Sequence, residues 1–518
     1  MATAGNLSIL ADSTDYAAAL TRSGAGGIAA GSGSIAKAKA NSSTIASTGE
    51  SLNLNVVGGS VNIQGDARSQ ADAQARGVNA GALAVGVSQA VADNSPTVMA
   101  YLGNHNTVYS HDLTIQARSL APVSGVGTSA DSTASGGGLV GVNATVSEAK
   151  NVTNVTSYVG DQSSLTTTGA LQVLAEGNTT QRADSTAITG GVVAVGANSS
   201  LATSNSTINA HLGQGVQIDG NNVSVSAQGR DDNYAESIAG SGGVVAGTAA
   251  KASTTSQGQT LAWVDEDARV EAESFDLKAE HRVDFNARTD STSASLLGAS
   301  GASADNTVSY TVKTLVDNGA KIQAKNVNIL AVNRMIKNWL PGHNVQSGSG
   351  GVIDAAAVKS TTTINADTQI TLGENVLLAV VGDRKASGAL VIEGFNDLRA
   401  YDRVKLDAGG AISVALAESR IQNGKNNVTL QIGKDSNLAS VGDIDLSVWN
   451  QTDIQTATNV KTYGGAGAAQ GKSYSQASIN ASILVGQGVG MDAKRDTNLR
   501  IGSNRKGDKG SQTILANT

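Results

Sequence analysis

Aliphatic and small residues follow one short pattern that recurs along the whole chain: aliphatic, any, aliphatic, any, small. The pattern begins at Leu7, Val61, Leu113, Leu171, Val223, Phe275, Val327, Leu390, Ile444 and Leu499. The mean interval is about 55 residues, and the three intervals between Leu171 and Val327 are each 52. Apolar and polar residues alternate with a period of two in each copy, without an apolar stripe of helical period. The pattern therefore predicts a tandem repeat built from strands.

Two further landmarks keep the same period. An aliphatic residue followed by Gly or Asp recurs eight times, as in Leu102–Gly103, Val159–Gly160 and Leu212–Gly213. A glycine turn that enters a run of small and aliphatic residues recurs at Gly136, Gly190, Gly242, Gly350 and Gly409. Three landmarks in a fixed order indicate that each repeat is one structural unit, which stacks on its neighbours to bury its apolar face.

These repeats predict an all-β fold, a parallel β-solenoid (β-helix) of about ten repeats of about 55 residues. Known solenoid rungs are often about 20 to 30 residues long, so each repeat is either two rungs or one rung with an extension. We favour one rung, in which three short strands surround a compact core and a long Ala/Gly-rich extension runs out, turns and returns. At about 4.8 Å per rung, ten rungs would form a rod roughly 50 Å long.

Composition favours thin, closely stacked sheets over several globular domains. Of the 518 residues, 61 are Gly, 3 are Phe and 3 are Pro, while 40% are hydrophobic. A large globular core usually contains more Leu, Phe and Met, and scarce Pro suits a fold in which most backbone N–H groups enter a ladder. We expect residues 1–518 to form a single continuous solenoid that belongs to a longer chain.

Two groups of polar residues have a place in the repeat. Asn333, Asn396 and Asn450 share one motif position, so we expect an asparagine ladder at a corner of the rod, with amides paired along its axis; a row of polar ligand-binding groups is the alternative. The acidic clusters 231–232 and 265–267 fall at expected turns, where Asp is common. We interpret them as solvated turn residues, and carboxylates of a polysaccharide-cleaving β-helix are the alternative.

One repeat is longer than the others: the interval from Val327 to Leu390 is 63 residues. It contains NRMIKNWLPGHNVQSGSGG, which we interpret as an irregular insertion at about 333–351. The simplest role is a hydrophobic cover over an irregular rung. The alternative is a ligand-binding loop on a regular scaffold, and its candidate contact residues are Met335, Trp339, Leu340 and His343.

Catalytic and metal-binding patterns are absent from the sequence. None of the five His residues has a metal-ligand spacing such as HExxH; a zinc site at the loop flanked by His105 and His111 is a remote alternative. The sequence contains no GxSxG elbow and no phosphate-binding loop. We therefore predict no enzyme activity, no catalytic residues, no cofactor and no metal.

Charge and hydropathy limit the partners. The net charge is −7 and no basic cluster stands out, so nucleic acid is not an expected partner. No run of 18 apolar residues occurs, so membrane insertion is not expected either. The chain has no Cys, which suits a long protein that crosses the periplasm unfolded, because nothing can crosslink on the way.

The unit AHLGQGVQIDGNNVSVSAQG resembles the repeats of filamentous-haemagglutinin-like and leukotoxin-type bacterial surface adhesins, as do YLGNHNTVYSHDLTIQARS and YVGDQSSLTTTGALQVLAEG. The resemblance covers essentially the whole chain and is specific to the architecture. It implies a long β-helical fibre, exported to the bacterial cell surface, that mediates attachment or biofilm cohesion. The partners it implies are a host-cell or matrix surface, including glycans, and the rest of the chain's own filament.

Three functions therefore compete. The first is a structural and adhesive stalk, which predicts that deletion of one whole repeat is tolerated. The second is a β-helical polysaccharide-active enzyme, which predicts a cleft where Asp, Lys or Arg side chains converge. The third is a carbohydrate- or host-binding module that acts through the 333–351 insertion. We expect the first, located outside the cell.

Overall fold

The computed structural model describes residues 5–382 and 388–517, and its regular elements are all β-strands. The strands are β1 (Leu7–Ala40), β2 (Ser43–Ser47), β3 (Asn53–Val56), β4 (Val61–Asn94), β5 (Thr97–Leu102), β6 (Thr107–Ser110), β7 (Leu113–Ser119), β8 (Thr128–Val159), β9 (Ser164–Thr167), β10 (Ala170–Leu212), β11 (Gln217–Asp219), β12 (Asn222–Val264), β13 (Arg269–Val316), β14 (Lys321–Lys337), β15 (Val345–Leu372), β16 (Leu377–Val380), β17 (Ala389–Ile432), β18 (Asn437–Ser440), β19 (Asp443–Tyr463), β20 (Ala466–Gln476), β21 (Asn480–Val485), β22 (Gly490–Ala493), β23 (Thr497–Ile501) and β24 (Gln512–Asn517). The pairings between them are parallel, and the chain is an all-β parallel solenoid, as predicted.

Each repeat forms one rung. Leu7 pairs with Val61, and Val61 pairs in turn with Leu113. The same register continues through Leu171, Val223, Phe275, Val327, Leu390 and Ile444. The eight aliphatic–Gly/Asp landmarks also fall in one column, from Leu102 to Val485. The choice of one rung per repeat is therefore confirmed.

The tenth copy of the motif begins earlier than predicted. Ile444 pairs with Thr497, and Leu499 pairs with Leu446. Leu499 therefore occupies the third position of the motif and not the first. A strand places every second residue on the same face, so a displacement by two residues leaves the pattern of apolar positions nearly unchanged.

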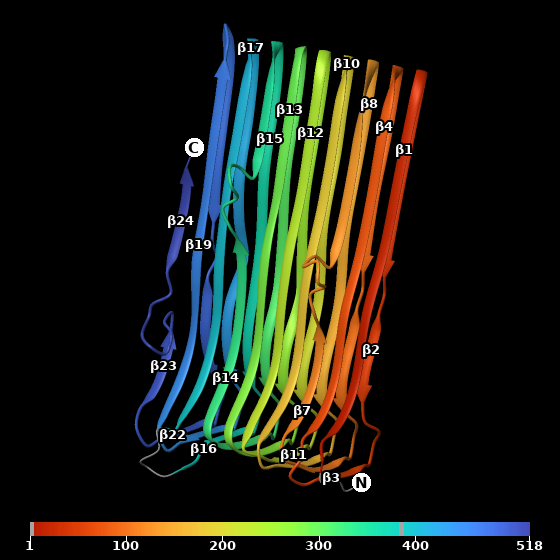
Figure 1. Cartoon of the computed structure of the whole chain (residues 1–518). Coiled ribbons are helices and arrows are strands. Elements are labelled where there is room, and N and C mark those ends of the chain that lie inside the picture. Colours follow the sequence, from red (N-terminus) through yellow and green to blue (C-terminus); the bar gives the residue numbers. More distant parts are fainter. Residues whose placement is uncertain (1–4, 383–387, 518) are drawn as a thin grey trace.

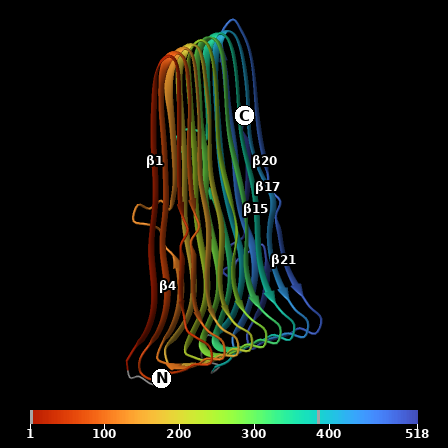
Figure 2. The same ribbon diagram turned by 90° about the vertical axis from the view of Figure 1, so that its right-hand side faces the viewer.

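A rung is a tall, narrow loop. In the rung that starts at Leu171, an ascending arm rises to Gly190, the chain reverses at an apex, and a descending arm returns to Leu212. The short strand β11 then closes the base of the rung. Figures 1 and 2 show the stack as a slab, with the apices aligned along one narrow edge and the short basal strands along the other.

The base of the slab has an aliphatic core. Its columns include Ile63, Ile115, Val173, Val225 and Leu277, which lie above one another and are inaccessible to solvent. Burial of each such side chain stabilises the fold by about 1.5–3 kcal/mol. These are the aliphatic residues of the motif, so the most regular part of the sequence forms the best-packed part of the rung.

The two arms approach each other through small side chains. A second cluster of buried residues consists largely of Ala, with columns such as Ala73, Ala130, Ala183, Ala235 and Ala287. Hydroxyls also meet across the gap, because Ser132 Oγ lies 2.7 Å from Ser147 Oγ and Ser185 Oγ lies 2.7 Å from Ser200 Oγ. Short side chains let the two sheets close, and these hydrogen bonds satisfy the buried hydroxyls.

The irregular segment of the long repeat is shorter than predicted. Strand β14 continues to Lys337 and strand β15 begins at Val345, so only residues 338–344 leave the sheet, and not 333–351. Before this loop, Phe275 pairs with Val327 at an offset of 52 residues. After it, Thr289 pairs with Val345 at an offset of 56, so the loop adds four residues.

The remaining extra length of that repeat lies at its base. Ala324 pairs with Val380 at an offset of 56 residues, whereas Val327 pairs with Leu390 at an offset of 63. Seven more residues are therefore inserted between Val380 and Leu390, partly outside the described residues. The strand pairing on either side of both insertions is in register.

The predicted asparagine column is present, but its hydrogen bonds do not run along the rod. Asn333, Asn396 and Asn450 pair in register and are buried. Their Nδ2 atoms donate to the opposite arm, to Tyr310 O, Asn427 O and Asn480 O at 3.2, 3.0 and 3.2 Å. The axial amide ladder at a corner is therefore wrong: the column lies between the arms, where carbonyls of the facing strand accept these bonds.

Candidate functional site at the Trp339 loop

Loop 338–344 is held by asparagine side chains of two rungs. Asn286 Nδ2 donates to Asn338 O at 2.9 Å, and Asn344 Nδ2 donates to Asn286 Oδ1 at 2.7 Å. Asn344 Oδ1 also accepts from the backbone N of Arg403 at 3.0 Å. Anchors at both ends fix the position of a loop that no strand pairing supports.

Trp339 lies on an aromatic and cationic surface of the next rung. Its ring stacks on Tyr401, with centroids 5.1 Å apart and planes 9° apart, and the guanidinium of Arg403 lies 4.8 Å from its centroid. Burial and the hydrogen bond to Asp453, 2.6 Å away, raise the pKa of Tyr401 to about 12. Trp339 is nevertheless 37% exposed, so part of its ring remains open to a ligand.

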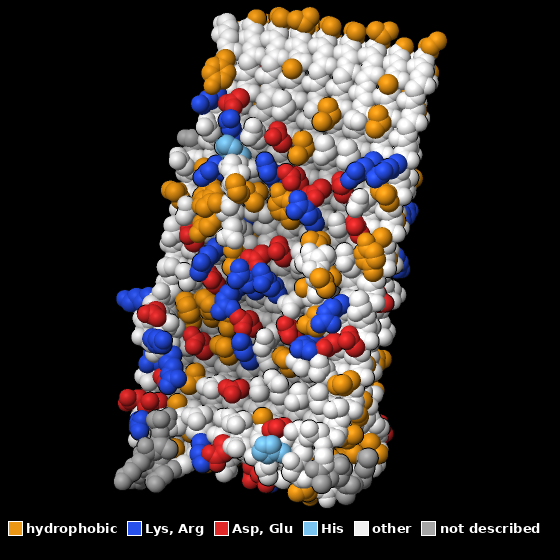
Figure 3. Space-filling model, viewed as in Figure 1, with side chains coloured by type: hydrophobic (Ala, Val, Ile, Leu, Met, Phe, Trp, Pro, Cys, Tyr) orange, Lys and Arg blue, Asp and Glu red, His pale blue; other side chains and the backbone are white. Residues whose placement is uncertain are grey.

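A depression of about 360 Å³ adjoins the loop on the outer face of the ascending arms. Its lining includes Leu340 from the loop and Arg230, Asp232, Arg282 and Asp284 from two neighbouring strands. Arg282 donates two hydrogen bonds to Asp284, at 2.8 and 2.9 Å. These two groups use their paired positions on each other, so adjacent hydroxyls of a sugar would bind to the remaining donor and acceptor positions of the pair. Figure 3 shows this face, with charged side chains gathered over its middle and lower parts.

The depression perturbs the titration of two of its groups. Burial raises the pKa of Asp232, and the neighbouring Asp284 raises it further, while Arg230 and Arg282 oppose the shift. Burial and the nearby Glu236 raise the pKa of Tyr234 to about 12.

The four predicted contact residues have different environments. Trp339 is exposed and Leu340 and His343 are half-buried at the surface. Burial, together with Lys405 and Arg403, lowers the pKa of His343. Met335 is 1% exposed and packs in an interior cluster with Phe285 and Leu398. Met335 therefore cannot contact a ligand at the surface, because it alternates inward from a strand and does not belong to the loop.

The acidic residue Asp231 is buried between the arms, and its interpretation as a solvated turn residue was wrong. It lies within strand β12 and accepts hydrogen bonds from Thr179, at 2.5 Å, and from Tyr310. His281 Nε2 lies 3.4 Å from Asp231 Oδ2. Burial would raise the pKa of Asp231, but these partners outweigh it and lower the pKa. The sequence suggested a turn because several polar residues follow one another here. The groups that hydrogen-bond to Asp231, Thr179 and Tyr310, are distant in the sequence, so they could not be recognised from it.

The His281–Asp231 pair is walled in by the strands around it. His281 Nδ1 lies 2.8 Å from Thr260 Oγ1, and Ser206 Oγ donates to Asp231 Oδ1 at 2.8 Å. Both His281 and Asp231 are inaccessible to solvent. This combination of hydroxyl, imidazole and carboxylate is therefore closed to substrate, and its role is to satisfy a buried charge.

An aromatic column that the sequence interpretation missed lies on the outer face of the descending arms. Tyr101, Tyr158, His211 and Trp263 stack on four successive rungs, with centroids 4.8, 4.9 and 4.0 Å apart. The signal was present, because each of these residues immediately precedes an aliphatic–Gly/Asp landmark. The faces of the rings are covered by the neighbouring rings. The column therefore stabilises the stack of rungs and leaves little ring surface on which a ligand could stack.

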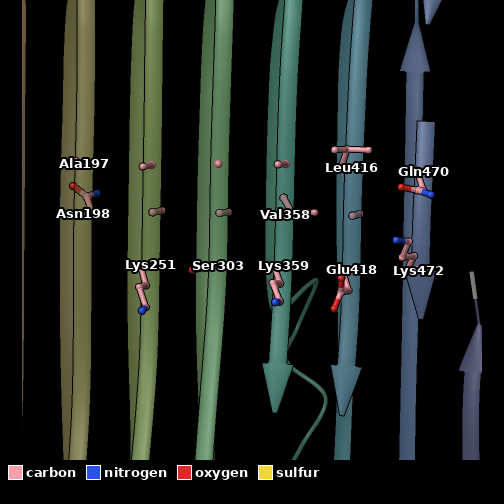
Figure 4. Close-up of a pocket in the computed structure, with 16 residues that line it drawn as sticks. Ala197, Asn198, Lys251, Ser303, Val358, Lys359, Leu416, Glu418, Gln470 and Lys472 are labelled. Atoms are coloured by element: carbon pink, nitrogen blue, oxygen red, sulfur yellow. The ribbon is translucent and has the colours of Figure 1, made fainter. Parts of the chain in front are cut away.

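A second depression, of about 540 Å³, crosses the descending arms near the apex (Figure 4). Small residues form its floor, among them Ala249, Ala250, Gly301, Ala302 and Ala357. The row along its lower side reads Lys251, Ser303, Lys359, Glu418 and Lys472 from one rung to the next. The row holds three Lys and one Glu and is therefore net positive, and Glu418 lies in register between Lys359 and Lys472, where opposite charges on adjacent strands stabilise the pairing.

The other predicted features are surface turns. Residues 265–267 form a turn at the base, as expected, and Asp267 has a positive φ of 57°.

Within residues 5–382 and 388–517, no three His, Asp or Glu side chains converge as metal ligands. The same residues form no helix long and apolar enough to span a membrane.

Comparisons with known proteins find nothing similar. No family model matches the chain, and neither a curated protein nor a solved structure matches it significantly.

Proposed function

We propose that this chain is a structural segment of a secreted bacterial surface filament that mediates attachment to host-cell or matrix surfaces, or cohesion in biofilms. The observation that carries the proposal is the register: each motif column passes from rung to rung with the same partners. A rod built in this way lengthens without any new kind of contact. The resemblance of its units to filamentous adhesin repeats supports the extracellular, adhesive role.

An attachment assay tests this proposal. Beads coated with the chain are expected to adhere to epithelial cells, to extracellular matrix or to a lawn of biofilm-forming bacteria, above beads coated with a β-rich protein of similar mass. Adhesion should persist when one whole rung is deleted, because an extended, repetitive surface holds no indispensable residue. The proposal would be contradicted if the beads adhered to none of the three surfaces.

Glycan binding at the Trp339 loop is a second candidate, favoured by the 360 Å³ depression that Asn338 and Leu340 of this loop help to line and by the partly exposed ring of Trp339 between them in the chain. A sugar ring would stack on Trp339 while the Arg282–Asp284 pair hydrogen-bonds its hydroxyls. On a glycan array, Trp339→Ala is expected to reduce binding at least about fivefold, since loss of an aromatic anchor typically costs more than about 1 kcal/mol. Arg403→Gln, which retains the Trp339 ring and its stacking partner Tyr401, should reduce binding less.

The outcomes of the glycan array are separable. Array binding that survives Trp339→Ala would remove this loop as the site without affecting the filament proposal. Release of reducing ends from a bound polysaccharide, abolished by Asp232→Asn, would instead favour the enzyme alternative.

A further inference from the structure

The apical edge of the slab carries aliphatic side chains on its outside. Two aliphatic or Ala residues follow each apical turn, and the second of them forms a register column: Leu83, Val140, Val193, Val245, Leu297, Ile353 and Ile412. The residue before each forms a parallel row: Ala82, Leu139, Val192, Val244, Leu296, Val352 and Ala411. Ile28 continues this row in the first rung. We call these two rows the apical ridge.

Most residues of the apical ridge are exposed, and Ala82 and Val193 are half-buried. Leu139 is 61% and Leu296 53% accessible, and in the second row Ile412 is 52% accessible. The ridge spans eight rungs, so at about 4.8 Å per rung it is roughly 35 Å long, and two residues wide it covers on the order of 350 Å². Contiguous apolar patches of this size on soluble proteins are often interaction sites.

The interior of the apex holds polar side chains and Ala, and no large aliphatic residue of the ridge points into it. Asn79, Ser293 and Asp354 are at most 2% exposed, and among the described residues none of their side-chain oxygens has a hydrogen-bond partner within the protein. The aliphatic residues of the ridge are therefore not on the outside because an apolar core behind them is already full. The sequence maintains them at the surface of rung after rung, although a charged residue there would improve solubility.

Charge is excluded from the surroundings of the ridge. The sequence has no charged residue in 23–36, 77–92, 132–147, 185–210, 237–250, 291–304 or 408–417. In the rung between the last two of these, Asp354 is the exception and it is buried. Figure 3 shows the result, a nearly charge-free band below an apical edge marked by hydrophobic side chains.

We propose that the apical ridge is the surface through which two copies of this chain pair side by side. A row of aliphatic side chains about 4.8 Å apart is matched in spacing by another rod of the same rungs. Neither edge contributes a charge that would repel the other. A lipid surface is a poorer match, because interfacial binders carry Lys, Arg and Trp beside their apolar face and this band has none.

The pairing should be weak for one chain and grow with length. A footprint on the order of 350 Å² per copy is below that of stable dimers, but every added rung extends the same contact, so longer rods gain avidity. This inference rests on the fold and not on the adhesive role. It stands or fails separately from attachment to host surfaces.

Cysteine trapping tests the contact directly, because the chain has no Cys of its own. Val244 lies near the middle of the ridge, so it approaches its counterpart whether the two rods run parallel or antiparallel. Val244→Cys is expected to form a disulfide dimer at least tenfold faster than Tyr109→Cys. Tyr109, on basal strand β6, is the matched control because it is 45% exposed against 44% for Val244.

Sedimentation velocity of the unmodified chain supplies the second measurement. A concentration-dependent shift above the 51.9 kDa monomer is expected, and Leu139→Lys, Val244→Lys and Val352→Lys combined should abolish it while Tyr109→Lys does not. A strict monomer, together with equal trapping rates for Val244→Cys and Tyr109→Cys, would overturn the inference. So would flotation of the chain with phosphatidylcholine vesicles that the same three lysine substitutions abolish, if no self-association accompanies it.

Discussion

At the scale of single residues, burial strongly changes the acid–base chemistry of His211. Its ring lies between those of Tyr158 and Trp263, and burial lowers its pKa to about 4 from 6.5. Between these values the unfolded chain binds a proton at this position and the folded chain does not. Stability attributable to His211 is therefore complete above pH 6.5 and is lost as pH falls towards 4.

His211→Phe should make the fold less sensitive to acid. Phe keeps a planar ring in the column but cannot take up a proton, so a loss of up to about 3 kcal/mol between pH 7 and pH 4 should disappear. Chemical denaturation at several pH values measures this directly. An equally steep pH dependence in the variant would show that other groups, such as the buried Asp231, dominate acid sensitivity.

Axial neighbours were predictable from the sequence, and neighbours across the slab were not. Residues above one another differ by one repeat length, so the motif alone aligned Ile63 with Ile115. Residues facing one another across the arms have no fixed separation, because it depends on their distance from the apex. The pairs Ser69–Asn94, Ser132–Ser147 and Ser185–Ser200 are separated by 25, 15 and 15 residues. The candidate site shows the same limit, since Trp339 was found as a rare residue but Tyr401 and Arg403 beneath it were not.

At the scale of elements, the apical turn depends on one column of glycines. At Gly81, Gly138, Gly191, Gly243, Gly351 and Gly410, an added Cβ would lie against the carbonyl oxygen of the preceding rung. The backbone of one rung passes closest to the next where the arms reverse, and a side chain has no room there. Ser295 occupies the equivalent place in one rung, so the requirement is strict but not absolute.

A pair of glycine substitutions should separate this crowding from backbone flexibility. Gly243→Ala is expected to destabilise the chain by about 1–3 kcal/mol, as overpacking does, because its Cβ meets Gly191 O. Gly247→Ala, four residues further on, has no atom within 4 Å of the new Cβ and should change stability by less than about 0.5 kcal/mol. Comparison of urea midpoints for the two variants decides the matter; equal effects would argue against axial crowding.

At the scale of the whole molecule, the rungs are interchangeable in their axial contacts. Leu7 pairs with Val61, and Val61 pairs with Leu113, so the first and third rungs present matching columns to the one between them. Loops such as 120–127 and 338–344 change the length of a rung but not this register. The rungs therefore differ from one another mainly in their loops and in the side chains that point outward.

Deletion of residues 61–112, one whole rung, should leave a folded rod. Leu113 would take the place of Val61 above Leu7, and each aliphatic column would close over the gap. Deletion of residues 61–86 removes only half of that segment but leaves a descending arm without its ascending partner, and should abolish cooperative unfolding. Circular dichroism and thermal unfolding of the two variants provide the measurement, and comparable melting of both would contradict independent rungs.

The one-rung spacing also governs how the chain can fold. Every axial contact joins residues about one repeat apart, so the loop that must close to add a rung has the same length at the tenth rung as at the second. The entropic cost of loop closure therefore does not grow with the length of the rod. A completed rung offers a ready edge on which the next segment can pair, so growth can proceed from one end as the chain emerges. Very long chains of this kind need fold no more slowly per rung than short ones.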